Sequence, residues 1–79
     1  MRERIRELIA EAFGLEVGAV PDDASVDVMA AWDSLHHIEL MLALELEFGV
    51  EITSEAMPVL LSADAIERYL REQGVSVAA

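Results

Sequence analysis

The chain contains no cysteine and no lysine, and it has only two prolines, four glycines and 5% aromatic residues. Without cysteine, neither a disulfide framework nor a thiolate zinc site can form. It also lacks an apolar run long enough for a signal peptide or a membrane span, so we expect a cytoplasmic protein. With 54% hydrophobic residues, the chain can bury one core, and we expect a single domain, 1–79.

Positive charge is scarce and confined to the two ends of the chain. Sixteen acidic residues face five arginines, which gives a formal net charge of -11 at pH 7. Such a charge repels nucleic-acid phosphates and anionic lipid, so we expect neither nucleic acid nor a membrane as a partner. It attracts basic protein surfaces, although an excess of acids can also serve solubility alone.

Helical periodicity is clear at both ends of the chain. Apolar residues recur at helical spacing in residues 2–13, and again in a segment that starts after Ser62 and reaches about residue 73. Ser62 is a residue type that caps helix N-termini. Residues 55–60 predict a short third helix, partly of the 3-10 type, because Pro58 is tolerated only in a first helical turn.

The segment 15–31 follows neither a helical nor a strand period and is rich in Gly, Pro and Asp. A loop of this length is unusual in a small domain and often functional. Together with a helix over residues 34–48, the pattern predicts an all-α fold of four helices, with a long loop between helices one and two. We expect five apolar side chains of the loop to fill the core: Leu15, Val17, Val20, Val26 and Met29.

The helix over residues 34–48 has Asp33 as its expected N-cap, Gly49 as its end, and two apolar stripes. One stripe is enough for the core of a small domain, so the second is expected to be partly exposed and to dock a partner whose apolar groove is rimmed by Arg or Lys. The alternative is a central helix buried on both sides. The first stripe is Leu40, Met41, Leu44 and Phe48; the second is Leu35, Ile38, Leu42 and Leu46, flanked by Glu39, Glu45 and Glu47.

Ser34 is the first residue of this helix, where the free backbone amides and the helix dipole favour an anion. A phosphodiester on its hydroxyl would gain this stabilisation. Asp33 beside it can cap the helix and help to hold a divalent cation or a basic partner. The alternative is that both residues are caps and nothing more.

Two catalytic or metal readings of the same segment are disfavoured. Ser34 and His37 are spaced for a hydrolytic pair, but the sequence has no nucleophile elbow and no evident oxyanion hole. A metal site from His36, His37 and Glu39 is poor because adjacent residues diverge by about 100° around a helix. We therefore expect no catalytic residue and no metal.

Asp33-Ser34-Leu35, followed by Ile38-Glu39-Leu40 and by residues 43–52, resembles the acyl carrier proteins and related peptidyl carriers. The similarity covers nearly the whole chain. It implies a four-helix bundle with a short third helix, and it implies a 4′-phosphopantetheine group from coenzyme A on Ser34. The thiol of that group would hold acyl or aminoacyl groups as thioesters, and the carrier itself would not be an enzyme.

The same resemblance implies a set of partners and a surface that they recognise. The expected partners are a phosphopantetheinyl transferase, an acyl-loading ligase or acyltransferase, and a ketosynthase or other condensing or tailoring enzymes, each acting on a monomeric carrier. Asp33 would stand beside the attachment point. The expected recognition residues are Leu35, Ile38, Glu39, Leu42, Glu45 and Leu46.

Several positions depart from the pattern of fatty-acid carriers. Trp32 before the Asp-Ser pair is similar to D-alanyl carriers and to free-standing carriers of specialised pathways, and Leu46 replaces a residue that is often acidic. His36 and His37 weaken the negative field beside Ser34 and are expected to make partner binding depend on pH. These departures favour polyketide, nonribosomal or related specialised biosynthesis over fatty acid biosynthesis. The alternative to a carrier is an unmodified acidic helical adaptor for one basic partner.

Overall fold

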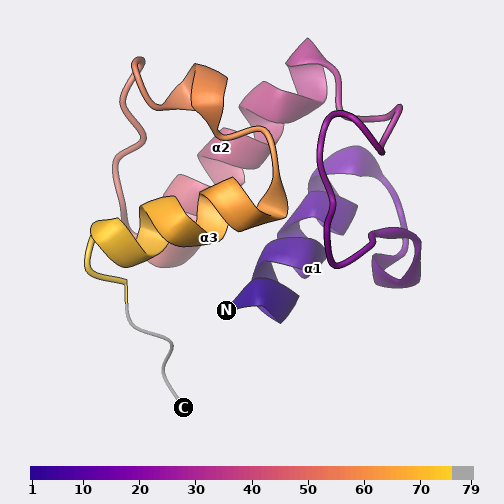
Figure 1. Ribbon diagram of the computed structural model, residues 1–79, viewed down its shortest axis with the longest axis horizontal. Helices are drawn as coiled ribbons and strands as arrows, with labels where there is room; N and C mark the ends of the chain where they lie inside the picture. Colours follow the sequence, from indigo (N-terminus) through magenta and orange to yellow (C-terminus); the bar gives the residue numbers. More distant parts are fainter. Residues whose placement is uncertain (76–79) are drawn as a thin grey trace.

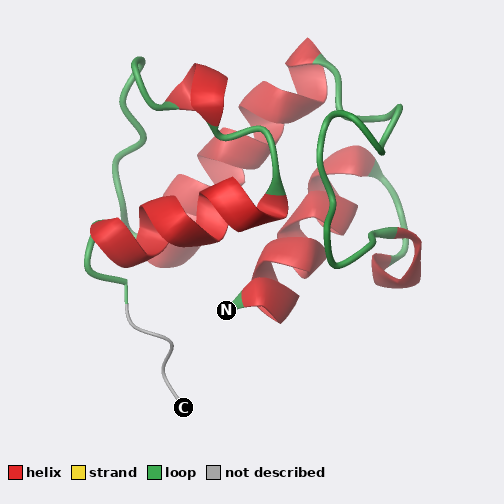
Figure 2. Ribbon diagram, viewed as in Figure 1, coloured by secondary structure: helices red, strands yellow, loops and turns green. Residues whose placement is uncertain are grey.

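Three α-helices surround the core in the computed structural model, which describes residues 1–75 (Figures 1 and 2). The elements in chain order are α1 (Arg2–Phe13), the 3-10 turn η1 (Val17–Ala19), α2 (Ser34–Phe48), the 3-10 turn η2 (Met57–Val59) and α3 (Ala63–Glu72). No strand forms within this part of the chain, which confirms the all-α class. Residues 76–79 of the expected domain 1–79 lie outside the described residues.

The helix ends follow the predicted caps. The Asp33 carboxylate accepts a hydrogen bond from the backbone N–H of His36 at 2.9 Å and begins α2. The Ser62 hydroxyl accepts one from the backbone N–H of Ala65 at 3.0 Å and begins α3. Gly14 and Gly49 follow α1 and α2 with φ angles of 70° and 65°, which are left-handed values that favour glycine.

The expected third helix is only a 3-10 turn. Residues 55–60 contain η2, and residues 1–75 form three α-helices, so the expectation of four helices is not confirmed. Pro58 explains the difference because it has no N–H to donate to the carbonyl of Ser54, as an α-helix would require. Thr53 instead closes a turn, since its side-chain oxygen accepts a hydrogen bond from the backbone N–H of Ala56 at 3.1 Å.

The core lies where the three helices meet. Val20 and Met29 of the loop 15–31 are buried as predicted, and Val26 is half-buried. Leu15 and Val17 are 37% and 38% exposed, so the prediction that they fill the core is wrong. Helix α1 ends before them and η1 lies at the surface. Two side chains that were not expected in the core are buried instead: Ala24 of the loop, at 0% exposure, and Trp32, which directly follows the loop, at 6%.

Two backbone hydrogen bonds tie the long loop to the start of α3. The N–H of Val26 donates to the carbonyl of Leu61 at 3.0 Å, and the N–H of Ala63 donates to the carbonyl of Ala24 at 2.8 Å. This pairing brings Val26 and Leu61 together although they are far apart in the sequence. The start of α2 lies beside this junction, so the pairing builds one wall of the site described next.

Candidate functional site

Ser34 stands exposed at the first position of α2. The Asp33 carboxylate caps the helix beside it by accepting a hydrogen bond from the backbone N–H of His36, and the Ser34 side chain is exposed rather than packed in the core. The positive end of the helix dipole favours negative charge at this point. The location is therefore suited to a covalently attached phosphodiester.

The charges next to Ser34 are set by Asp33 and His36. The pKa of Asp33 is lowered, first because its carboxylate accepts the hydrogen bond from the His36 backbone N–H, and to a lesser degree because the His36 ring is near. The His36 Nδ1 atom lies 3.0 Å from Oδ1 of Asp33, and the His36 ring packs against Phe13 with 5.3 Å between ring centroids. Asp33 therefore remains ionised as a cap throughout the neutral pH range.

A groove of about 170 Å³ opens beside Ser34. Three of its lining side chains are apolar, and the exposed Ser34 lies at its edge. Val26 and Leu61 were not expected here, since the loop-to-α3 pairing that brings them together leaves no local signal in the sequence. The lining residues are Val26, Trp32, Asp33, Ser34, His37 and Leu61.

His37 is held by hydrogen bonds on both sides of its ring. The indole Nε1–H of Trp32 donates to Nδ1 of His37 at 3.0 Å, and Nε2 of His37 lies 2.8 Å from the carbonyl oxygen of Met57. The ring is therefore not placed to take a proton from Ser34. His36 packs on α1 whereas His37 faces η2, so the two histidines do not converge with Glu39 on one point.

The second apolar stripe of α2 is exposed, as predicted. Leu35, Ile38, Leu42 and Leu46 are 64%, 49%, 56% and 86% exposed, whereas Leu40, Met41 and Leu44 on the other side are at most 1% exposed. Helix α2 is therefore not buried on both sides. Because a patch of large apolar side chains at a protein surface often marks a contact site, this stripe is a candidate docking surface.

The three glutamates that flank the stripe differ in their contacts. The Glu45 carboxylate accepts a hydrogen bond from the backbone N–H of Ile52 at 2.8 Å, and Glu47 is paired with Arg4. Glu39 is exposed, and its carboxylate makes no hydrogen bond or ion pair within residues 1–75. Glu39 is thus the flanking acid most available to a partner.

Within residues 1–75, no helix combines the length and the apolar character needed to cross a membrane.

Residues 3–70 match the family described as the phosphopantetheine attachment site. Over 75 residues the chain is 36% identical to the acyl carrier proteins of Bradyrhizobium sp. (strain ORS 278), Nitrobacter hamburgensis and Rhodopseudomonas palustris (strain TIE-1), with 94% of this chain and 94% of each relative covered. The chain therefore belongs to the acyl carrier protein family, and its cofactor is 4′-phosphopantetheine.

Proposed function

We propose that Ser34 is the residue that carries the 4′-phosphopantetheine group. The observation that carries this proposal is the exposed hydroxyl at the N-terminus of α2, beside an apolar groove of about 170 Å³. In the transfer, the Ser34 oxygen bonds to the diphosphate phosphorus of coenzyme A that bears the pantetheine, and the diphosphate bond from this phosphorus breaks to release adenosine 3′,5′-bisphosphate. The hydroxyl proton leaves to a base of the transferase.

The residues of the chain hold the attachment point and do not perform the acyl chemistry. Asp33 caps α2 and keeps Ser34 at the first helical position, and the positive end of the helix would stabilise the phosphodiester there. When bound, the prosthetic group supplies a thiol that holds an acyl or aminoacyl group as a thioester. The protein is thus a non-catalytic carrier that acts as a monomeric domain of residues 1–79 in the cytoplasm.

The exposed stripe of α2 is the surface that partner enzymes recognise. A large apolar stripe beside a free carboxylate suits an apolar groove rimmed by basic side chains. The partners are a phosphopantetheinyl transferase, an acyl-loading ligase or acyltransferase, and condensing or tailoring enzymes such as a ketosynthase. Glu45 also accepts a hydrogen bond from the backbone N–H of Ile52, so it has a structural role as well. The recognition residues are Leu35, Ile38, Glu39, Leu42, Glu45 and Leu46.

The pathway served is polyketide, nonribosomal or related specialised biosynthesis. This assignment is supported by Trp32, which is 6% exposed and packs edge-on against Phe13 with 5.5 Å between ring centroids. The bulky indole before the attachment serine is therefore part of the core and also part of the groove wall. Carriers of the general fatty-acid pathway prefer a small residue at this position, as the resemblance implies.

Mass spectrometry tests the attachment site. After incubation with coenzyme A, magnesium and a promiscuous phosphopantetheinyl transferase, we expect a mass gain of about 340 Da, the mass of the added group. Ser34→Ala should abolish the gain. The matched control is Ser54→Ala, which removes an exposed serine hydroxyl outside the helices and should retain the gain. No gain in the unaltered chain would favour the unmodified adaptor.

A further inference from the structure

The groove beside Ser34 is separated from the core by a chain of hydrogen bonds. Trp32 donates through Nε1–H to Nδ1 of His37, so this nitrogen carries no proton, and the ring proton is on Nε2. That proton is donated to the carbonyl oxygen of Met57, at 2.8 Å from Nε2. One neutral tautomer therefore satisfies all three groups at once.

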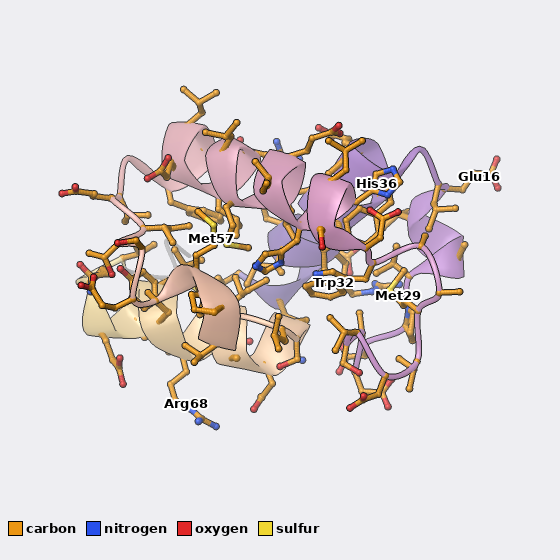
Figure 3. All side chains as sticks on the ribbon, turned by 90° about the horizontal axis from the view of Figure 1, so that it is seen from above. Glu16, Met29, Trp32, His36, Met57 and Arg68 are labelled. Carbon is orange, nitrogen blue, oxygen red and sulfur yellow. The ribbon has the colours of Figure 1, made fainter. Side chains whose placement is uncertain are left out.

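This chain of bonds crosses between α2 and η2. Trp32 comes from the loop before α2, His37 from the first turns of α2, and Met57 from η2. Figure 3 shows the Met57 side chain pointing from η2 toward α2, and Trp32 lying below the start of α2. Trp32 and His37 both line the groove, and Trp32 also belongs to the buried core, so this part of the wall lies between the groove and the core.

The interior behind this wall is filled. Leu40, Met41 and Leu44 of α2 are at most 1% exposed, as are Ile66 and Leu70 of α3. An alkyl chain entering from the groove would have to separate the Trp32, His37 and Met57 groups and displace these side chains. The separated indole N–H and backbone carbonyl would then face an apolar chain that offers them no partner.

We propose that this carrier keeps its acyl cargo outside the helix bundle, and that the Trp32–His37–Met57 hydrogen-bond chain is the barrier that keeps it there. The cargo class is then short or polar acyl and aminoacyl groups rather than long alkyl chains. A long alkyl chain held outside would remain in water and lose the burial that stabilises it. This inference rests on the proposed attachment at Ser34.

A series of loaded carriers tests the barrier. Acetyl, hexanoyl and dodecanoyl forms are made from the corresponding acyl-coenzyme A with the promiscuous transferase, and each is verified by mass. A group that binds only the folded state raises the melting temperature. We therefore expect melting temperatures that agree within about 1 °C across the series, together with an unchanged emission maximum of Trp32, the one tryptophan of the chain. A melting temperature that rises stepwise with chain length, or a shift of the emission with dodecanoyl, would overturn the proposal.

Two variants locate the barrier at His37. His37→Ala removes the ring that bridges Trp32 and Met57, and we expect its melting temperature to rise with acyl chain length. His36→Ala is the matched control. It removes the neighbouring ring, which packs on Phe13 and takes no part in the hydrogen-bond chain, so its melting temperature should not change with acyl chain length. The role of His37 would be contradicted if the melting temperature of a folded His37→Ala did not change with acyl chain length. It would also be contradicted if the melting temperature of His36→Ala rose with chain length. If His37→Ala does not fold, Trp32→Phe replaces it, since the aromatic ring stays while the indole N–H is lost.

The mass measurement separates this inference from the proposed function. A chain that gains no mass from any acyl-coenzyme A contradicts the attachment at Ser34. A chain that is loaded fully and then shows chain-length dependence contradicts only the barrier.

Discussion

The carboxylate of Glu45 accepts a hydrogen bond from the backbone N–H of Ile52, with 2.8 Å between Oε2 and the amide nitrogen. This bond joins the last turns of α2 to the connector that follows Gly49. Ile52 is 7% exposed and belongs to the core, so the bond fixes a buried residue as well as the path of the chain. Glu45 therefore has a structural function that Glu39, two turns earlier, does not share.

Glu45→Ala should lower the free energy of unfolding by about 1–3 kcal/mol, because it leaves the amide of Ile52 without its charged acceptor. Glu39→Ala should change it by less than about 0.5 kcal/mol, as a surface substitution does. Urea denaturation of both variants measures the difference. Glu45→Gln is the control, since its amide oxygen can still accept from Ile52 and should recover part of the loss. Equal losses for the two alanine variants would contradict this reading.

Ile38→Glu should leave the fold intact and weaken recognition by partner enzymes. Ile38 is 49% exposed, so a carboxylate at this position stays in water, but it interrupts the apolar stripe of α2. We expect kcat/KM of the phosphopantetheinyl transferase to fall about tenfold, a change of about 1.4 kcal/mol, with the melting temperature nearly unchanged. Leu44→Ala is the contrasting variant: its side chain is fully buried, and its loss should cost about 2–5 kcal/mol of stability. An unfolded Ile38→Glu would show that the stripe belongs to the core.

The sequence predicted the features that depend on local spacing. The bounds of α1 and α2 are as expected, and the division of α2 into a buried and an exposed stripe is confirmed residue by residue, except that Phe48 is half-buried. These results follow from the period of 3.6 residues and from caps that lie within a few residues of the helix ends. Nothing about them depends on contacts between distant parts of the chain.

The features that the sequence did not predict depend on such distant contacts. The bond from His37 to Met57 spans 20 residues, and the pairing of Ser25 with Ser62 joins the loop to α3. Trp32 stood out only as a departure from the fatty-acid pattern, although it fills the core and forms the groove wall. Apolar content alone does not say which loop side chains face inward, because no period orders them.

Arg2 should contribute more to stability than an exposed arginine of α3. It reaches from α1 to α3, where Nε donates to Glu67 at 2.7 Å and a terminal nitrogen donates to Asp64 at 2.9 Å. Its side chain is 25% exposed, whereas Arg68 is 72% exposed and pairs with Asp64 alone. We expect Arg2→Ala to lower the free energy of unfolding by about 1–2 kcal/mol, and Arg68→Ala by less than about 0.5 kcal/mol. Thermal denaturation checks the order, and equal effects would contradict it.

The pairing of Arg4 with Glu47 should make stability depend on pH in one direction. The pKa of Glu47 is lowered from its ordinary value of 4.5, first by the hydrogen bonds from Arg4. A carboxyl group with a lower pKa in the folded state stabilises the fold above about pH 4.5 and loses this effect as the pH falls through the folded pKa, because the unfolded chain binds the proton first. The gap in free energy of unfolding between the unaltered chain and Glu47→Gln should therefore be largest near pH 7 and shrink toward about pH 3.5. Protonation of the other acids relieves the excess negative charge in both proteins alike, so the gap isolates Glu47; a gap that grows on acidification would contradict the assignment.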